Sequence, residues 1–249
     1  MATAAAFYRL EPGRQVEVRV TVPLRDELVG KPVSVKTQPA DLWRVEMDRR
    51  IRLQVPDKKV QFLFEAALRT VVLHTANQQA YPGPFTYKRF WFRDAAYILY
   101  ALLCANLTRR ARGVLATYPD RQKAGGYFQS QQGEWDSNGQ ALWIYYQYWK
   151  MSGEELPPEW IHSIRKGAGW ILHKRLNNQG NAPHAGLLPA GFSAEHFGPN
   201  DYYYWDDFWS VAGLLRATEM LYSNDGEASA SRYYREAHNL LKAIHQSLE

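Results

Sequence analysis

The sequence predicts a mainly α-helical fold that forms part of an α/α toroid, preceded by a short N-terminal β or irregular segment. Three observations predict it. Apolar residues change from alternate to helical spacing at Pro56, the connections between expected helices alternate between long and short, and the helices after long connections are apolar on most sides. With 249 residues, 46% of them hydrophobic, the chain can bury a full core.

Residues 1–55 form the predicted N-terminal segment. Valines at alternate positions in 16–22 indicate a half-buried strand, because successive side chains of a strand point to opposite faces. Extended or turn structure is expected through 25–55, where Pro32 and Pro39 favour turns. This segment is too short for an independent β-sandwich, so we expect it to be the end of a preceding β-domain.

Residues 56–249 are predicted to fold as the first half of an α/α-toroid domain. Asp57 before an apolar run and Pro158 before Glu159 are typical of helix starts. The apolar spacing predicts seven helices, at 57–76, 92–106, 108–118, 136–152, 158–177, 206–222 and 230–248.

The lengths of the connections between these helices indicate how the helices are arranged. Helices joined by a short turn run antiparallel, so the three long connections, 77–91, 119–135 and 178–205, fall at the same end. The helices that follow them are the most apolar, which predicts about three parallel inner helices covered by about four outer ones. An ordinary helical bundle remains the alternative.

Each predicted inner helix begins with carboxylates: Asp94, Asp136, and the adjacent Asp206 and Asp207. Helix capping is the simple explanation, because the N–H groups at a helix start stabilise an anionic side chain. Aromatic residues gather at the same helix ends, however, and an aromatic pocket with a few polar groups suits a small ligand such as a sugar. These aromatics are Phe90, Trp91, Phe92, Trp135, Tyr202, Tyr203, Tyr204, Trp205 and Trp209.

Three stretches resemble a known family group. "FTYKRFWFRDAAYILYALL", "GGYFQSQQGEWDSNGQALWIYYQYW" and the run ending in "YYYWDDFW" are similar to the six-hairpin α/α-toroid glycoside hydrolases of the glucoamylase and glycogen-debranching type. The resemblance covers about residues 57–249. It implies an inverting hydrolase of α-glucosidic linkages in glycogen- or starch-type glucans, without a cofactor.

The resemblance also implies residue roles. Arg93 and Asp94 match the family's pair that holds sugar hydroxyls, and Trp205 precedes a diacid in which Asp206 protonates the leaving oxygen while Asp207 supports it. The family carries glutamates at these two positions, so Asp207 could be the acid instead. The other expected substrate-binding residues are Trp91, Trp135, Asp136, Tyr204 and Trp209.

An inverting glycosidase needs a second carboxylate to activate water. The resemblance places this base in a later hairpin, beyond residue 249, and Glu195 and Asp201 in the last long connection are more typical of solvated turns. We therefore expect a fragment that carries the acid half of the site, is weakly active or inactive, and self-associates through its open edge.

Other functions fit less well. A non-catalytic carbohydrate-binding scaffold stays open, as does a polysaccharide lyase or sugar epimerase on the same fold, although a lyase would require more arginines at the helix ends. His184 and His196 lack a metal-ligand spacing, so no metal is expected.

The net charge of +5 is scattered, which argues against a nucleic-acid groove. The apolar run 95–105 is too short for a membrane span, and with no signal peptide visible we expect a cytoplasmic protein with Cys104 in its core.

Overall fold

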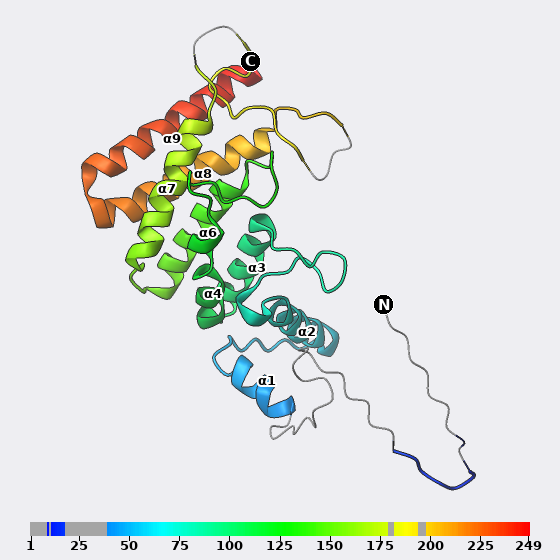
Figure 1. Cartoon of the computed structure of the whole chain (residues 1–249). Coiled ribbons are helices and arrows are strands. Elements are labelled where there is room, and N and C mark those ends of the chain that lie inside the picture. The colour runs from blue at the N-terminus through cyan, green and yellow to red at the C-terminus, as the bar shows by residue number, and fades with distance from the viewer. Residues whose placement is uncertain (1–8, 10, 18–38, 179–181, 194–197) are drawn as a thin grey trace. The chain divides into compact units, whose positions relative to one another are not determined.

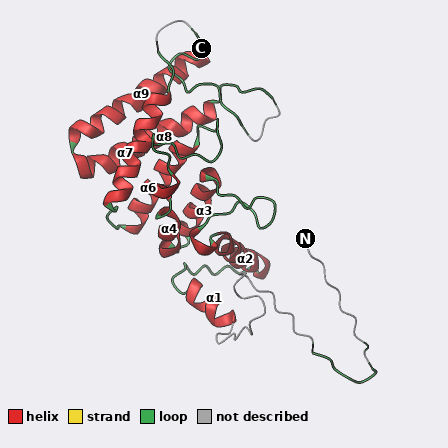
Figure 2. Ribbon diagram, viewed as in Figure 1, coloured by secondary structure: helices red, strands yellow, loops and turns green. Residues whose placement is uncertain are grey.

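The computed structural model describes residues 9, 11–17, 39–178, 182–193 and 198–249. The chain divides into two compact units, Met1–Asp48 and Arg49–Glu249. The described parts are mainly helical, with no strand and one isolated β-bridge, between Gly191 and Asp201 (Figure 2). The prediction of a mainly α fold is confirmed, while the partial toroid remains a prediction.

The first unit contains one described helix, α1 (Pro39–Met47). The expectation of extended or turn structure through 25–55 is therefore wrong at this segment. Proline suits the first position of a helix, because the N–H it lacks would have no partner there, and Asp41 pairs with Arg44 over 2.9 Å one turn later. Of the predicted strand, only residues 16 and 17 are described, and neither lies in a strand; 18–22 are outside the described residues.

The second unit begins with α2 (Lys58–His74), in which the side chain of Asp57 caps the first turn by accepting from the N–H groups of Lys59 and Val60. The predicted helix 108–118 ends early, and a separate short helix begins at Tyr118. The following helices are α3 (Phe92–Cys104), α4 (Thr108–Leu115), α5 (Tyr118–Arg121), α6 (Ser137–Ser152), α7 (Pro158–Lys174), α8 (Tyr204–Asp225) and α9 (Glu227–Leu248).

Helices α3, α6 and α8 lie side by side in that order (Figure 1). Helices α4 and α7 each contact two of these three, and α2 and α9 pack against α3 and α8 respectively. The three central helices run parallel, because the contacts of each neighbouring pair follow the same order along both helices. Between α3 and α6, Arg93 meets Asp136 at the helix starts and Tyr100 meets Trp143 further along. Between α6 and α8, Asp136 meets Trp205 at the helix starts and Tyr146 meets Glu219 further along. The long connections leave from the same side of the helices in Figure 1.

Helices α6 and α8 touch backbone to backbone. A Cβ atom added to Gly139 would lie 2.1 Å from the carbonyl oxygen of Trp209, and one on Gly213 would lie 2.6 Å from the Cα of Gly139. No real Cβ approaches that closely, so glycine is required at both positions. This contact brings the starts of α6 and α8 close together.

Cys104, which the sequence places in the core, is exposed at the last position of α3. In the part of the chain that the structure describes, no helix is both long and apolar enough to cross a membrane.

Candidate active site

Arg93 joins the start of α3 to the segment before α6. Its Nε atom lies 3.0 Å from Oδ2 of Asp136, and its Nη2 atom donates over 3.0 Å to Oε1 of Glu134. The arginine side chain is 20% exposed and both carboxylate side chains are 2% exposed. Because a carboxylate is removed from water only when it is paired, this arginine is what allows two acids to be buried here.

Asp136 also links α6 to the start of α8. Its Oδ2 atom accepts from Nε2 of Gln140 over 3.0 Å and from the indole Nε1 of Trp205 over 2.9 Å. Although Asp136 occupies the N-cap position of α6, its side chain makes no capping hydrogen bond. The capping explanation is therefore wrong for Asp136, whose carboxylate instead joins three helix starts.

Glu134 is a site residue that the sequence interpretation did not single out. Its carboxylate is buried beside Arg93, and its main-chain oxygen accepts from the Tyr127 hydroxyl over 2.6 Å. The sequence does contain a pattern that points to Glu134, because Glu134 and Asp136 flank Trp135 immediately before an apolar helix. Two carboxylates flanking a tryptophan suggest that both acids share one partner.

Asp206 lies in the first turn of α8 and is 6% exposed. Burial raises its pKa to about 8, helped by the negative charges of Asp136, Asp207 and Glu134 and opposed by Arg93. Among the described residues, nothing donates a hydrogen bond to its carboxyl group, which would otherwise lower the pKa. Asp206 is therefore protonated at neutral pH, and its proton is not held by a neighbouring acceptor.

Asp207 has different surroundings although it is the next residue. Its Oδ1 atom accepts from the main-chain N–H of Leu188 over 2.9 Å. Burial raises its pKa to about 6, while the Leu188 hydrogen bond and the positive charge of Arg175 oppose that rise. Asp207 thus joins α8 to the preceding connection. Asp206 instead lies near Glu134 and Asp136, and we call these three residues the acid cluster.

Three aromatic rings form a row beside the acid cluster. Trp205 and Trp209 lie one helical turn apart with ring centroids 5.9 Å apart, and Tyr97 of α3 meets Trp209 at 6.1 Å. Trp205 is 47% exposed and Tyr97 is 46% exposed, so both offer ring surface to a ligand. We call these three residues the aromatic row.

Three other predicted aromatics lie elsewhere. Trp135 is buried with Tyr127 and Leu188, and its indole donates to the Pro189 carbonyl, so the expectation that it offers a face to a sugar is wrong. The Tyr204 hydroxyl is hydrogen-bonded to Ser247 of α9. Trp91 is half-buried, with the guanidinium of Arg89 over its ring at 4.1 Å.

The remaining predicted residues have simpler surroundings. Asp94 is half-buried in the first turn of α3, and exposed Asp201, in the β-bridge to Gly191, accepts from the N–H of Tyr202. His184 stacks on Tyr202 at 4.4 Å, while Glu195 and His196 lie outside the described residues. Within the described ranges, no group of three or more histidine, cysteine or acidic side chains is arranged to hold a metal ion.

No family model matches the chain, and neither a curated protein nor a solved structure was found to be significantly similar to it.

Proposed function

We propose that this protein is an inverting glycoside hydrolase that acts on α-glucosidic linkages of glycogen- or starch-type glucans. In this proposal Asp206 and the residues around it supply the proton-donating half of the site. The observation that carries the proposal is the buried Asp206 carboxyl, whose pKa is raised to about 8 beside Asp136 and Glu134. A general acid for glycoside cleavage must hold its proton at neutral pH and release it to the leaving oxygen. Asp206 meets the first requirement.

In this proposal Asp206 gives its proton to the glycosidic oxygen as the bond to the sugar breaks. Arg93 holds Asp136 and Glu134 close by, and burial, together with their negative charges, keeps Asp206 protonated until the substrate arrives. The same guanidinium charge favours the carboxylate that forms after the transfer. Arg93 thus acts through its neighbours rather than on the substrate alone.

Asp207 has a positioning role in this account. Its hydrogen bond to Leu188 fixes the first turn of α8, and with it the direction in which Asp206 leaves the helix. The opposite assignment, with Asp207 as the acid, is disfavoured because the Asp207 carboxylate already accepts a hydrogen bond and has the lower pKa, about 6. The parallel α3, α6 and α8 with their covering helices support the proposed partial toroid.

The leaving-group dependence of glucoside cleavage tests the proposal, with azide added as the nucleophile because the described residues supply only the proton-donating half of the site. An alkyl α-glucoside leaves poorly and needs protonation, whereas a nitrophenyl α-glucoside leaves well and needs little. Asp206→Asn should therefore reduce the rate on the alkyl substrate by roughly 100- to 10,000-fold, and far less on the nitrophenyl substrate. Asp207→Asn should affect the two substrates equally, because it disturbs position rather than proton transfer. Equal losses for both substrates in Asp206→Asn would contradict the assignment.

A non-catalytic carbohydrate-binding protein is the second candidate, and the exposed rings of Trp205 and Tyr97 favour it. Calorimetry with maltooligosaccharides does not separate the two, because both predict binding that survives Asp206→Asn. Cleavage in the presence of azide does separate them. Binding without azide-assisted cleavage of either glucoside would favour the scaffold, and the absence of both would exclude both candidates.

A further inference from the structure

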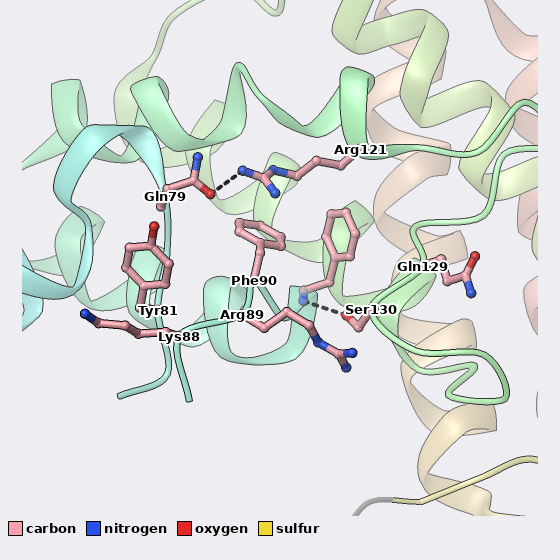
Figure 3. Close-up of a pocket in the computed structure, with 9 residues that line it drawn as sticks. Gln79, Tyr81, Lys88, Arg89, Phe90, Arg121, Gln129 and Ser130 are labelled. Atoms are coloured by element: carbon pink, nitrogen blue, oxygen red, sulfur yellow. Dashed lines mark hydrogen bonds between the residues drawn. The ribbon is translucent and has the colours of Figure 1, made fainter. Parts of the chain in front are cut away.

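A cavity is lined by the segment that precedes α3. Its volume is about 410 Å³, within the range of small-molecule sites. The residues that line it come from the connections before α3 and α6 and from α5 (Figure 3). They include Arg121, Arg89, Lys88, Gln79, Tyr81 and Phe90.

The cavity is cationic. Arg121, Arg89 and Lys88 line it, and none of its described lining residues is an aspartate or glutamate. In the described part of the chain, none of these three side chains lies within ion-pair distance of a carboxylate. Positive charges that face one cavity without a counter-charge attract an anion, and arginine suits phosphate because its planar donors match the phosphate oxygens.

Arg121 is held in position before any ligand arrives. Its Nε atom donates to the Thr117 hydroxyl over 2.9 Å, and its Nη2 atom donates to Oε1 of Gln79 over 2.6 Å. The guanidinium also lies over the Phe90 ring at 3.9 Å. Neither hydrogen bond uses Nη1, so N–H groups remain for a ligand, and little side-chain freedom is lost on binding.

The opposite edge of the cavity carries the other two cations. In Figure 3, Arg121 and Gln79 lie along the upper edge, and Lys88 and Arg89 lie along the lower edge. Arg89 is steadied by the Trp91 ring at 4.1 Å and by Gln131, whose Oε1 accepts over 3.1 Å. Lys88 makes no hydrogen bond to the described residues, so its ammonium is available.

We propose that this cavity binds a phosphomonoester of a sugar-sized molecule. Nη1 of Arg121 is available to the phosphate, Lys88 and Arg89 add positive charge at the opposite edge, and the volume left over, bordered by Tyr81, Gln79 and Gln129, accommodates a hydroxylated body. This inference does not depend on the acid cluster. Residues of the same two segments, 88–93 and 129–136, nevertheless line the cavity and form the ion pairs of Arg93 with Glu134 and Asp136.

Isothermal titration of the 249-residue chain with glucose 6-phosphate, glucose and inorganic phosphate tests the proposal. Glucose 6-phosphate should bind, and Arg121→Met should weaken it by about tenfold or more, since a charge-assisted hydrogen bond is lost while the stem over Phe90 remains. Lys88→Gln should weaken it by about threefold and cannot unfold the chain, because this side chain is exposed and without partners. Lys123→Gln removes the same charge outside the cavity and should change nothing.

The three ligands separate the sources of the anion. Tighter binding of glucose 6-phosphate than of inorganic phosphate supports a phosphorylated sugar, and equal affinity supports the anion site with free phosphate as its occupant. If titration with glucose gives a binding heat that Lys88→Gln leaves unchanged, glucose binds at another site, such as the one beside Asp206. The proposal is overturned if neither phosphate compound binds at millimolar concentration, or if Lys88→Gln, Arg121→Met and Lys123→Gln all bind as the unaltered chain does.

Discussion

The indole N–H of Trp205 donates to Oδ2 of Asp136 over 2.9 Å, although the two residues are 69 positions apart in the sequence. This hydrogen bond joins the starts of two helices. The same Oδ2 atom lies 3.0 Å from Nε of Arg93, at the start of a third helix. One carboxylate thus connects α3, α6 and α8. The burial and the raised pKa of Asp206 follow from this convergence, and the predictions below test it.

Replacement of Asp136 by asparagine should destabilise the fold by about 2 kcal/mol at neutral pH, because Arg93 loses one of its two buried carboxylates. The loss is smaller than for a fully broken buried pair, since Glu134 remains and asparagine keeps an oxygen for Trp205. Urea unfolding measures it. Asp120→Asn is the matched control, because Asp120 is exposed and should change stability by less than about 0.5 kcal/mol. Equal effects of the two changes would show that the Asp136 contacts contribute little.

Stability should fall as the pH rises from about 4 to about 8. The pKa of Asp206 is raised from 3.8 to about 8 and that of Asp207 to about 6, so in this range the folded chain binds more protons than the unfolded chain. Each group lowers the free energy of unfolding by up to about 1.4 kcal/mol per pH unit while it is protonated only in the folded state. Above about pH 8 this contribution no longer changes.

Asp206→Asn isolates the contribution of one group, because asparagine has no proton to lose. The variant should gain stability relative to the unaltered chain as the pH rises from 5 to 8, measured by urea unfolding at both values. Asp120→Asn should follow the unaltered chain. A parallel pH dependence in all three proteins would mean that Asp206 titrates normally.

Two helical glycines provide a test of the contact between α6 and α8. Gly139→Ala should destabilise the fold by about 1–3 kcal/mol or more, because the new Cβ would lie 2.1 Å from the Trp209 oxygen and the helices must separate. Gly169→Ala in α7 is the control: no atom lies within 4 Å of its Cβ, and alanine favours a helix by up to about 1 kcal/mol. Thermal unfolding should move in opposite directions for the two variants. A shift in the same direction would place the close helix contact elsewhere.

Sequence periodicity predicted most of the helices because apolar spacing reflects which face is buried. It missed α1 because Pro39 was interpreted as a turn residue, although proline is equally suited to the first position of a helix. Cys104 and Trp135 show the other limit. Cys104 lies in an apolar run of the sequence but is exposed, whereas Trp135 lies between two acids and is buried, because the depth of a side chain depends on which neighbours pack over it.

The candidate site could be predicted as a set of acid-bearing helix starts but not as a network. Nothing local in the sequence shows that Arg93 pairs with Glu134 and Asp136, because those contacts depend on the order of the helices in space. The distinction between Asp206 and Asp207 likewise depends on Leu188, which comes from a distant connection. These contacts between distant segments are what the structure adds.

The titration of the Asp206 carboxyl tests the central claim most directly. Carbon-13 NMR of aspartate carboxyl groups follows it, and the missing resonance in Asp206→Asn assigns the signal. The account predicts a midpoint near 8 that falls in Asp136→Asn, because a neighbouring negative charge is removed. A midpoint close to the ordinary value of 3.8, unchanged in Asp136→Asn, would contradict it.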